Sequence, residues 1–414
     1  MKINFRKQSS VYLDYASTTP VSKEVVLAMN KFWTKHFHNP NGLYQASVDS
    51  HNYIEGFRKK IASHFDVRAQ EIVFTSGGTE SDNLAIQGVV YAFLKNNKTV
   101  TPHVIVSSIE HPAVLECVTN LEKQKKIRVS VIPVLGSGVI DISALKKEIT
   151  KETILVSVMH VNNEIGVVQP VKEISKIIRH FKKNTVGDHN SVYPLLHTDA
   201  SQSIAYCDIS LHALGFDLLS CNAGKICGPK GVGLLITRKH VPIESILFGG
   251  NQEFSIRPGT QALPLIAGFS QALEDALSHK DAEVQRLREY KKYLYEFFVE
   301  RYSEVIINGS QDEFLSVPSI LNISYPHIES DLLVIELDHK GFCVSSKTAC
   351  KYDNPDESYV LQALRPEMND LPEAYGTLRI SFGRYTKKKD IVAFTKAFSE
   401  VVDKYQKFQS VLEK

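Results

Sequence analysis

The stretch EIVFTSGGTESDNLAI, residues 71–86, joins a short apolar run to an amphipathic segment through two glycines and a threonine. The apolar run predicts a strand, and the later positions with the spacing of one helix face are Ile86, Val89, Val90 and Phe93. Free N–H groups at the start of such a helix, together with the helix dipole, can bind an anion. A plain strand-to-helix turn in which Thr79 caps the helix explains the same residues.

The alternation of apolar runs and amphipathic segments extends on both sides of this stretch. From about residue 70 to 240 the apolar runs are EIVFTS, HVIVSS, VSVIP, ILVSVMH, PLLHTD, FDLLSC and VGLLITR. Such alternation predicts an α/β domain with a mostly parallel sheet. Upstream of it, one helix face is expected from Ile54, Phe57, Ile61 and Phe65.

A second pattern follows Pro258 and Gly259. A long charged helical stretch at about 262–302 leads to strand-like SILNISY and GFCVSS and to helical DLLVIELD. The last helix is marked by a stripe of Ile391, Phe394, Phe398, Val401 and Tyr405. This part of the chain predicts a smaller α+β domain.

The bulk composition narrows the class of function. A chain of 414 residues with 43% hydrophobic residues can bury a large core. Lys plus Arg number 48 against 46 Asp plus Glu, a net charge of +2 that favours a small polar substrate over direct nucleic-acid binding. No apolar run is long enough to span a bilayer and the start of the chain lacks an apolar signal region, so we expect a soluble, cytoplasmic protein without a membrane partner.

Six cysteines carry no CxxC pair and no spacing typical of a disulfide framework, so reduced thiols are expected and no metal site is expected. Free cysteines are usually small buried hydrophobic residues, an interpretation that fits Cys117, Cys207, Cys221 and Cys227. Cys350 differs, because it ends VSSKTAC and precedes the polar, turn-rich KYDNPDES. We therefore expect Cys350 on an accessible, mobile loop as a nucleophile, where Lys347 could lower its pKa or simply be solvated.

Two further motifs follow apolar strands. HTDASQS places Asp199 and Gln202 at the carboxyl edge of the predicted sheet, where ligands of open α/β sheets bind. Asp199 there could pair with a protonated ring nitrogen or merely cap the next helix. SCNAGKICGPKGVG places Lys225 after another strand; a Schiff-base lysine needs a partly desolvated site, although most lysines are simply solvated.

The chain resembles the cysteine desulfurases of the class V aminotransferase family, which use pyridoxal 5'-phosphate (PLP). The resemblance lies in the order along the chain of the Gly-Gly-Thr turn, Asp199, Lys225 and Cys350. The resemblance covers nearly the whole chain, from YLDYASTTP at Tyr12 to SFGRYT at Thr386. The most specific matched strings are EIVFTSGGTESDNLAI, ILVSVMHVNNEIGVVQP, HTDASQS, GPKGVG, RPGT and SYVLQAL.

This resemblance implies the fold of PLP-dependent transferases of fold type I. It implies an N-terminal segment at 1–20 that packs with the small domain. A large PLP-binding domain with a mostly parallel seven-stranded sheet would span 21–261. A small α+β domain at 262–414 would carry the catalytic cysteine loop.

The resemblance also implies roles for individual residues. Gly78, Thr79 and Asn222 would hold the cofactor phosphate, with Thr260 reaching the phosphate of the partner subunit in a homodimer. His111 would stack on the pyridine ring and relay protons, and Asn163 and Gln202 would hydrogen-bond cofactor or substrate near the phenolic oxygen. Substrate carboxylate would be clamped by Asn39 and Arg379, since a guanidinium fork suits a planar anion.

The implied reaction converts L-cysteine to L-alanine. PLP would act as an electron sink, with Asp199 at its ring nitrogen and Lys225 as tether and proton carrier. The Cys350 thiolate would take the sulfur as a persulfide. The span from Cys350 to Arg379 resembles the long loop of group I enzymes, which implies a sulfur-acceptor protein in iron-sulfur cluster assembly or tRNA thiolation.

Several positions depart from the family's pattern. Gly224 and Asn222 stand where a histidine and a serine usually contact the phosphate, so one phosphate donor is lost. The other departures are Gln45 for a histidine, Phe254 for a basic residue and Lys347 for a glycine.

Two alternative functions remain. One is another class V aminotransferase or lyase that uses Lys225 but not Cys350. The other is a non-catalytic scaffold that binds a sulfur-transfer partner, which the changes at Gly224 and Asn222 suggest.

Overall fold

The computed structural model describes residues 10–185, 192–326, 328–346, 358–365 and 376–412. The chain divides into two compact units. The larger unit comprises Thr19–Asn162 and Val168–Lys280. The smaller comprises Met1–Thr18, Asn163–Val167 and Asp281–Lys414.

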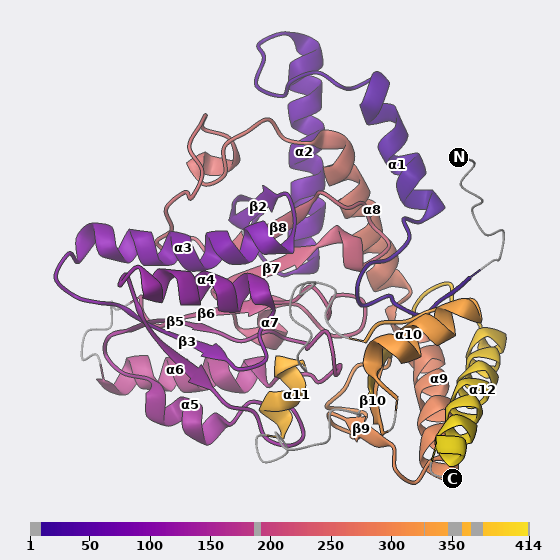
Figure 1. The fold of residues 1–414 in the computed structure, drawn as a ribbon. Coiled ribbons are helices and arrows are strands. Elements are labelled where there is room, and N and C mark those ends of the chain that lie inside the picture. The colour runs from indigo at the N-terminus through magenta and orange to yellow at the C-terminus, as the bar shows by residue number, and fades with distance from the viewer. Residues whose placement is uncertain (1–9, 186–191, 327, 347–357, 366–375, 413–414) are drawn as a thin grey trace. The chain divides into compact units, whose positions relative to one another are not determined.

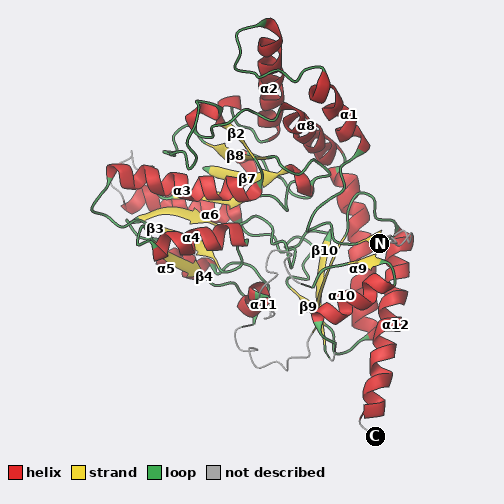
Figure 2. Ribbon diagram, turned by 45° about the horizontal axis from the view of Figure 1, so that its top comes forward, coloured by secondary structure: helices red, strands yellow, loops and turns green. Residues whose placement is uncertain are grey.

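A seven-stranded sheet, in the order β2-β8-β7-β6-β5-β3-β4, forms the centre of the larger unit's described residues (Figure 2). Its strands are β2 (Ile72–Thr75), β3 (His103–Ser107), β4 (Arg128–Ile132), β5 (Thr153–Ser157), β6 (Leu195–Asp199), β7 (Leu218–Asn222) and β8 (Gly233–Thr237). Only β8 runs antiparallel to its neighbours β2 and β7 among these strands. Each predicted apolar run between 70 and 240 forms one strand, so the predicted mostly parallel seven-stranded sheet is confirmed.

Helices accompany this sheet in the larger unit (Figure 1). They are α1 (Lys23–Thr34), α2 (Gln45–His64), α3 (Gly78–Asn96), α4 (Pro112–Lys123), α5 (Ile142–Glu148), α6 (Val171–Thr185), α7 (Leu211–Leu214) and α8 (Leu263–Ser278). Short 3₁₀ turns are η1 (Ala69–Glu71), η2 (Ala223–Lys225) and η3 (Glu253–Ser255).

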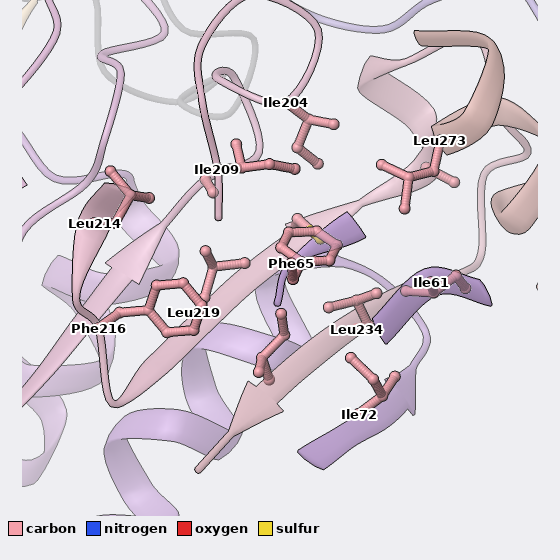
Figure 3. Packing of buried hydrophobic residues seen from close by; sticks show 14 of the residues in the cluster. Ile61, Phe65, Ile72, Ile204, Ile209, Leu214, Phe216, Leu219, Leu234 and Leu273 are labelled. Carbon is pink, nitrogen blue, oxygen red and sulfur yellow. The ribbon is translucent and has the colours of Figure 1, made fainter. Parts of the chain in front are cut away.

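Both faces of the sheet are apolar because neighbouring residues of each strand point to opposite sides. Leu195 and Leu218 belong to a buried cluster that includes Leu84 of α3 and Val114 of α4. The next residues along β6 and β7 belong to a second cluster on the other face. Figure 3 shows this second cluster, in which Leu219 and Leu234 of the sheet pack with Ile61, Phe65, Phe216 and Leu273.

The parallel strands direct the turns that follow them to one edge. The turns after β2, β3, β6 and β7 carry, respectively, Gly78, His111, Ser201 and Lys225. Because the carboxyl ends of parallel strands share an edge, residues distant in sequence are brought to one place.

The smaller unit contains a three-stranded antiparallel sheet and a two-stranded parallel one among its described residues. The first has the order β12 (Gly376–Ser381), β10 (Ile320–Tyr325), β9 (Ile306–Asn308), and the second pairs β1 (Val11–Tyr12) with β11 (Phe342–Cys343). Its helices are α9 (Lys280–Arg301), α10 (Ser330–His339), α11 (Tyr359–Leu364) and α12 (Lys388–Leu412). The predicted stripe of α12 is buried from Ile391 to Val401, with Phe398 edge-on to Phe298 at 5.0 Å between ring centroids.

The division between the units differs from the expected boundary at residues 261 and 262. The expected helical stretch forms two helices that part at His279, and the first of them, α8, belongs to the larger unit. Its residues Ile266, Phe269 and Leu273 are buried in the same cluster as the sheet. Helix α8 therefore belongs to the larger unit because its apolar face packs there. The helical periodicity of the sequence shows that a face is apolar but not what that face contacts.

None of the described helices combines the length and the apolar composition needed to span a bilayer.

A buried ion pair between Arg58 of α2 and Glu253 of η3 ties three segments of the larger unit together. Arg58 is 2% exposed, and its Nη1 and Nη2 each donate to a Glu253 carboxylate oxygen at 2.7 Å. Glu253 also accepts from the backbone N–H of Phe74 at 2.8 Å. The pair holds a turn in which Glu253, Phe254 and Ser255 all have positive φ, of 46°, 60° and 64°, a conformation unfavourable for residues other than glycine.

Glu253→Gln is expected to lower the free energy of unfolding by about 3–5 kcal/mol. It removes the buried carboxylate that pairs with both Nη atoms of Arg58 and leaves that guanidinium with the half-buried Glu55 carboxylate at Nε, 2.9 Å away. Denaturant unfolding measures the change. The control is Glu244→Gln, which removes an exposed pair to Lys95 whose Oε1–Nζ distance is 2.7 Å. That control should cost less than about 1 kcal/mol; equal losses in the two variants would contradict a special role for the buried pair.

Candidate active site

At the carboxyl edge of the larger unit's sheet, His111 lies within electrostatic reach of both Asp199 and Lys225. Asp199 ends β6, Lys225 ends the turn η2 after β7, and His111 precedes α4. Burial is the main cause that lowers the pKa of His111; Lys225 lowers it further, whereas Asp199 opposes the shift. A neutral ring is therefore favoured at His111 in a place that also contains a carboxylate and an amine.

The orientation of His111 is fixed by its position before α4. The ring Nδ1 accepts a hydrogen bond from the backbone N–H of Ala113 at 3.1 Å, so the side chain caps the helix. When the ring is neutral, this acceptor role leaves the proton on Nε2. His111 can thus present an N–H at one nitrogen while the helix holds the other.

Thr19 holds the backbone on both sides of Lys225. Its hydroxyl group donates to the carbonyl oxygen of Gly224 at 2.9 Å and accepts from the backbone N–H of Cys227 at 2.8 Å. Cys227 has a φ of 60°, which is uncommon outside glycine. Thr19 therefore stabilises a sharp turn that sets the direction in which the Lys225 side chain leaves the backbone.

A set of hydrogen-bond donors surrounds Gly78, the first residue of α3. A Cβ atom placed on Gly78 would lie 3.2 Å from Ser201 Oγ and 3.3 Å from Asn222 Nδ2. Ser201 is 8% exposed, and its Oγ has no hydrogen-bond partner among the described residues. A hydroxyl group, a side-chain amide and the N-terminus of a long helix together suit a phosphate group, so these residues fit the phosphate of PLP.

The turn before α3 is also tied to the loop that carries Thr260. Arg257 Nε donates to Glu80 Oε1 at 2.7 Å, and Glu80 Oε2 accepts from the backbone N–H of Ser76 at 2.6 Å. The Glu80 pKa stays below its usual value: burial works against this, and the hydrogen bonds from Arg257 and Ser76 outweigh it. Thr260 itself is exposed, three residues after Arg257.

Two of the expected substrate residues come together in the smaller unit. Arg379 on β12 is 2% exposed, and its Nη1 donates to the backbone carbonyl of Asn163 at 3.0 Å. Its Nη2 donates to Asp14 Oδ1 at 2.8 Å and to Ser17 Oγ at 2.6 Å. Arg379 Nε and Asn163 Oδ1 are buried without hydrogen-bond partners among the described residues, so a donor and an acceptor remain available to a polar ligand.

For the remaining expected residues the structure gives position and exposure. Gln202 is half-buried in the turn after β6, Thr79 is exposed at the start of α3, and Asn39 is exposed in the loop between α1 and α2. Cys350 and Lys347 lie outside the described residues.

Sequence reasoning missed Ser201 and Thr19. Both lie inside strings that carried the family resemblance, HTDASQS and YLDYASTTP. Ser201 is two residues after Asp199 and Thr19 precedes Pro20. These positions gave little indication of a functional role, because serine and threonine are common in turns. Only the folded chain shows which of these hydroxyl groups face the site.

Comparison with known proteins assigns the family. The model of the family "Aminotransferase class-V" matches residues 11–394, so the chain belongs to that family. It is 38% identical over 394 residues to the "Cysteine desulfurase IscS" of Dictyoglomus turgidum, covering 95% of each chain. The predicted resemblance to cysteine desulfurases is confirmed.

Solved structures agree with this assignment. The chain resembles a structure named "NIFS-LIKE PROTEIN" with a TM-score of 0.84 and 32% identity, over 95% of this chain and 99% of that one. It also resembles the structure "SspA in complex with cysteine", with a TM-score of 0.74 and 29% identity, over 91% and 99% of the two chains. The predicted PLP-dependent fold type I is confirmed.

Ser201→Ala is expected to raise the dissociation constant of the apoprotein for PLP about tenfold, the value of one hydrogen bond to a charged group. Absorbance titration measures it. The matched control is Ser203→Ala, because Ser203 Oγ already donates to the carbonyl oxygen of Ala200 at 2.9 Å. Equal affinities of the two variants would show that Ser201 does not contact the phosphate.

Proposed function

We propose that this chain is a PLP-dependent cysteine desulfurase that converts L-cysteine to L-alanine and takes up the sulfur as a persulfide on Cys350. The observation that carries the proposal is the gathering of Asp199, Lys225 and His111 beside a set of phosphate donors at one sheet edge. Relatives named cysteine desulfurase over most of the chain support it. A relative solved with cysteine supports the substrate.

The larger unit would hold the cofactor at its phosphate, its ring nitrogen and its aldehyde carbon. Gly78, Ser201 and Asn222 surround the phosphate site, and the Asp199 carboxylate would pair with the ring N–H. Lys225 would bind the cofactor through its amine, and the flat ring of His111 would cover one face. Bound PLP supplies an electron sink that makes Cα of the substrate acidic.

The residues of this chain would then manage protons. The Lys225 amine would carry the proton that leaves Cα of the substrate. Neutral His111, with its proton on Nε2, can pass a proton to or from the substrate. The Asp199 carboxylate would pair with the ring nitrogen and favour its protonated form.

Arg379 would bind the substrate carboxylate. Three of its contacts, to Asp14, Ser17 and the Asn163 carbonyl, fix the guanidinium plane before any ligand arrives. A fixed fork loses little entropy when it binds a planar anion. Asn39 would complete the clamp, and Gln202 and Asn163 would hydrogen-bond cofactor or substrate near the phenolic oxygen.

Cys350 would receive the sulfur. Its thiolate attacks the substrate sulfur, an S–S bond forms, and the bond from that sulfur to Cβ breaks. The electron pair stays with the carbon skeleton, which leaves as L-alanine after protonation. The persulfide would pass to an acceptor protein for iron-sulfur cluster assembly or tRNA thiolation, and we propose a cytoplasmic homodimer in which Thr260 completes the partner's phosphate site.

Brief exposure of the protein to L-cysteine is expected to add one sulfur atom to Cys350, seen by mass spectrometry of its peptide. Cys350→Ala should abolish both this addition and the release of sulfide, because Cys350 is the proposed sulfur acceptor. The control is Cys343→Ala, which removes a half-buried free thiol of β11 and should leave both intact.

Two outcomes would favour the alternatives. Product formation from another amino acid, unchanged in Cys350→Ala, would indicate an aminotransferase or lyase. A purified protein that stays colourless after PLP is added would indicate a non-catalytic scaffold.

Gly224→His is expected to retain PLP longer on dialysis than the unmodified protein, because the imidazole adds a phosphate donor. A Cβ on Gly224 would lie 3.2 Å from Asn222 Oδ1, a tight contact that requires this side chain to shift by a few tenths of an ångström, and 3.8 Å from Lys230 Cγ. Absorbance of the dialysed protein measures retention. Equal retention would show that Ser201 and Asn222 already compensate for the missing histidine.

A further inference from the structure

A row of polar side chains crosses one face of the larger unit's sheet just before its carboxyl edge. His197 of β6 lies between Ser157 of β5 and Ser220 of β7: its Nδ1 is 2.8 Å from Ser157 Oγ and its Nε2 is 3.0 Å from Ser220 Oγ. Asp82 of α3 hydrogen-bonds Ser220, and its Oδ1 lies 3.6 Å from His197 Nε2. We refer to Ser157, His197, Ser220 and Asp82 as the polar row.

The polar row adjoins Asp199. Asp199 is two residues after His197 on β6, so both side chains point to the same face. The Cα atoms of Asp199 and Ser220 are register partners between β6 and β7. Ser220 therefore contacts the Asp82 carboxyl group from a position directly beside Asp199.

The surroundings of the polar row are apolar. The same side of β5, β6 and β7 continues with Leu155, Leu195 and Leu218, which belong to one buried cluster. Asp82 is 1% exposed and His197 is fully buried. No lysine or arginine of the described residues forms an ion pair with Asp82, and its Oδ1 has no hydrogen-bond partner among them.

An ionised carboxylate in such a place has a large desolvation cost without a cation to offset it. The titratable groups that face Asp82 from neighbouring elements do not help. Asp199 and Glu110 are carboxyl groups and supply no positive charge. Burial raises the pKa of the Glu110 carboxyl group itself to about 8. Cys117 is a buried thiol, and burial lowers the pKa of His197 to about 4, so this ring is neutral.

We propose that Asp82 is a positioning residue that stays protonated at neutral pH. Together with the rest of the polar row it would hold the surroundings of Asp199 in place without adding a negative charge. Burial, the largest cause, together with the neighbouring Asp199 raises the pKa of Asp82 well above its usual value, in agreement with this state.

The consequence concerns which carboxyl group carries the charge. Two adjacent buried carboxyl groups do not both ionise readily, so a protonated Asp82 puts no second negative charge beside Asp199. Asp199 lies at the carboxyl end of β6, where its Oδ1 accepts from the backbone N–H of Ser201 at 2.8 Å. This consequence for the ring nitrogen of the cofactor rests on the proposed function, whereas the protonation of Asp82 does not.

Infrared spectroscopy of the apoprotein tests the protonation directly. Asp82→Asn should lose one band of a protonated carboxyl group at neutral pH, compared with the unmodified protein. The matched control is Glu80→Gln on the same helix, because the Glu80 carboxylate is ion-paired with Arg257 and ionised. Loss of no band in Asp82→Asn would overturn the proposal.

The positioning role is tested by the pH at which absorption of bound PLP changes. Asparagine mimics a neutral aspartic acid, so Asp82→Asn should leave that pH unchanged. Asp82→Leu, which leaves Ser220 without the Asp82 partner, should shift it. A shift of a full pH unit in Asp82→Asn would mean that a charge was removed, and no shift in Asp82→Leu would mean that the polar row does not act on Asp199; either result overturns the role.

The two proposals fail separately. If Asp82→Asn loses the infrared band and the unmodified protein binds no PLP, the proposed function fails and the protonation of Asp82 stands.

Discussion

The common direction of the parallel strands is the constraint on which the candidate site depends. Strand β6 ends at Asp199, and the turns after β2, β3 and β7 end at the same edge. Residues separated by more than a hundred positions meet there because strand order, and not sequence proximity, determines their distance. Short polar turns after the strands supply most of the site, while the strands themselves are mainly apolar and turn polar near their carboxyl ends.

The larger unit contains two solutions to the problem of a buried carboxyl group. Glu253 makes a bidentate contact with the Arg58 guanidinium and holds a turn with three positive φ values. Among the described residues no lysine or arginine pairs with Asp82, so burial favours its uncharged form. The first solution fixes backbone geometry through strong charge-assisted hydrogen bonds. The second places no additional negative charge next to Asp199.

The sequence predicted the sheet because each buried strand is a continuous apolar run, the pattern expected when both faces are covered. It could not assign α8, since helical periodicity shows that a face is buried but not against which partner. Asp199 and Lys225 were predicted from their motifs, whereas Ser201 and Asp82 were not. A hydroxyl group near Gly78, or an aspartate inside a helix, has meaning only once the fold shows what lies opposite.

The departures from the family pattern have local physical accounts. Phe254 stands where a basic residue is usual, and its ring lies over the buried guanidinium of Arg58, 5.1 Å from ring centroid to Cζ. A second cation there would repel Arg58, whereas the π-face attracts it. At Gly224 the carbonyl is held by Thr19, so the turn that directs Lys225 does not depend on a side chain at 224. Glycine at 224 lacks the hydrogen-bond donor that a histidine would provide, while Thr19 holds the backbone on both sides of Lys225.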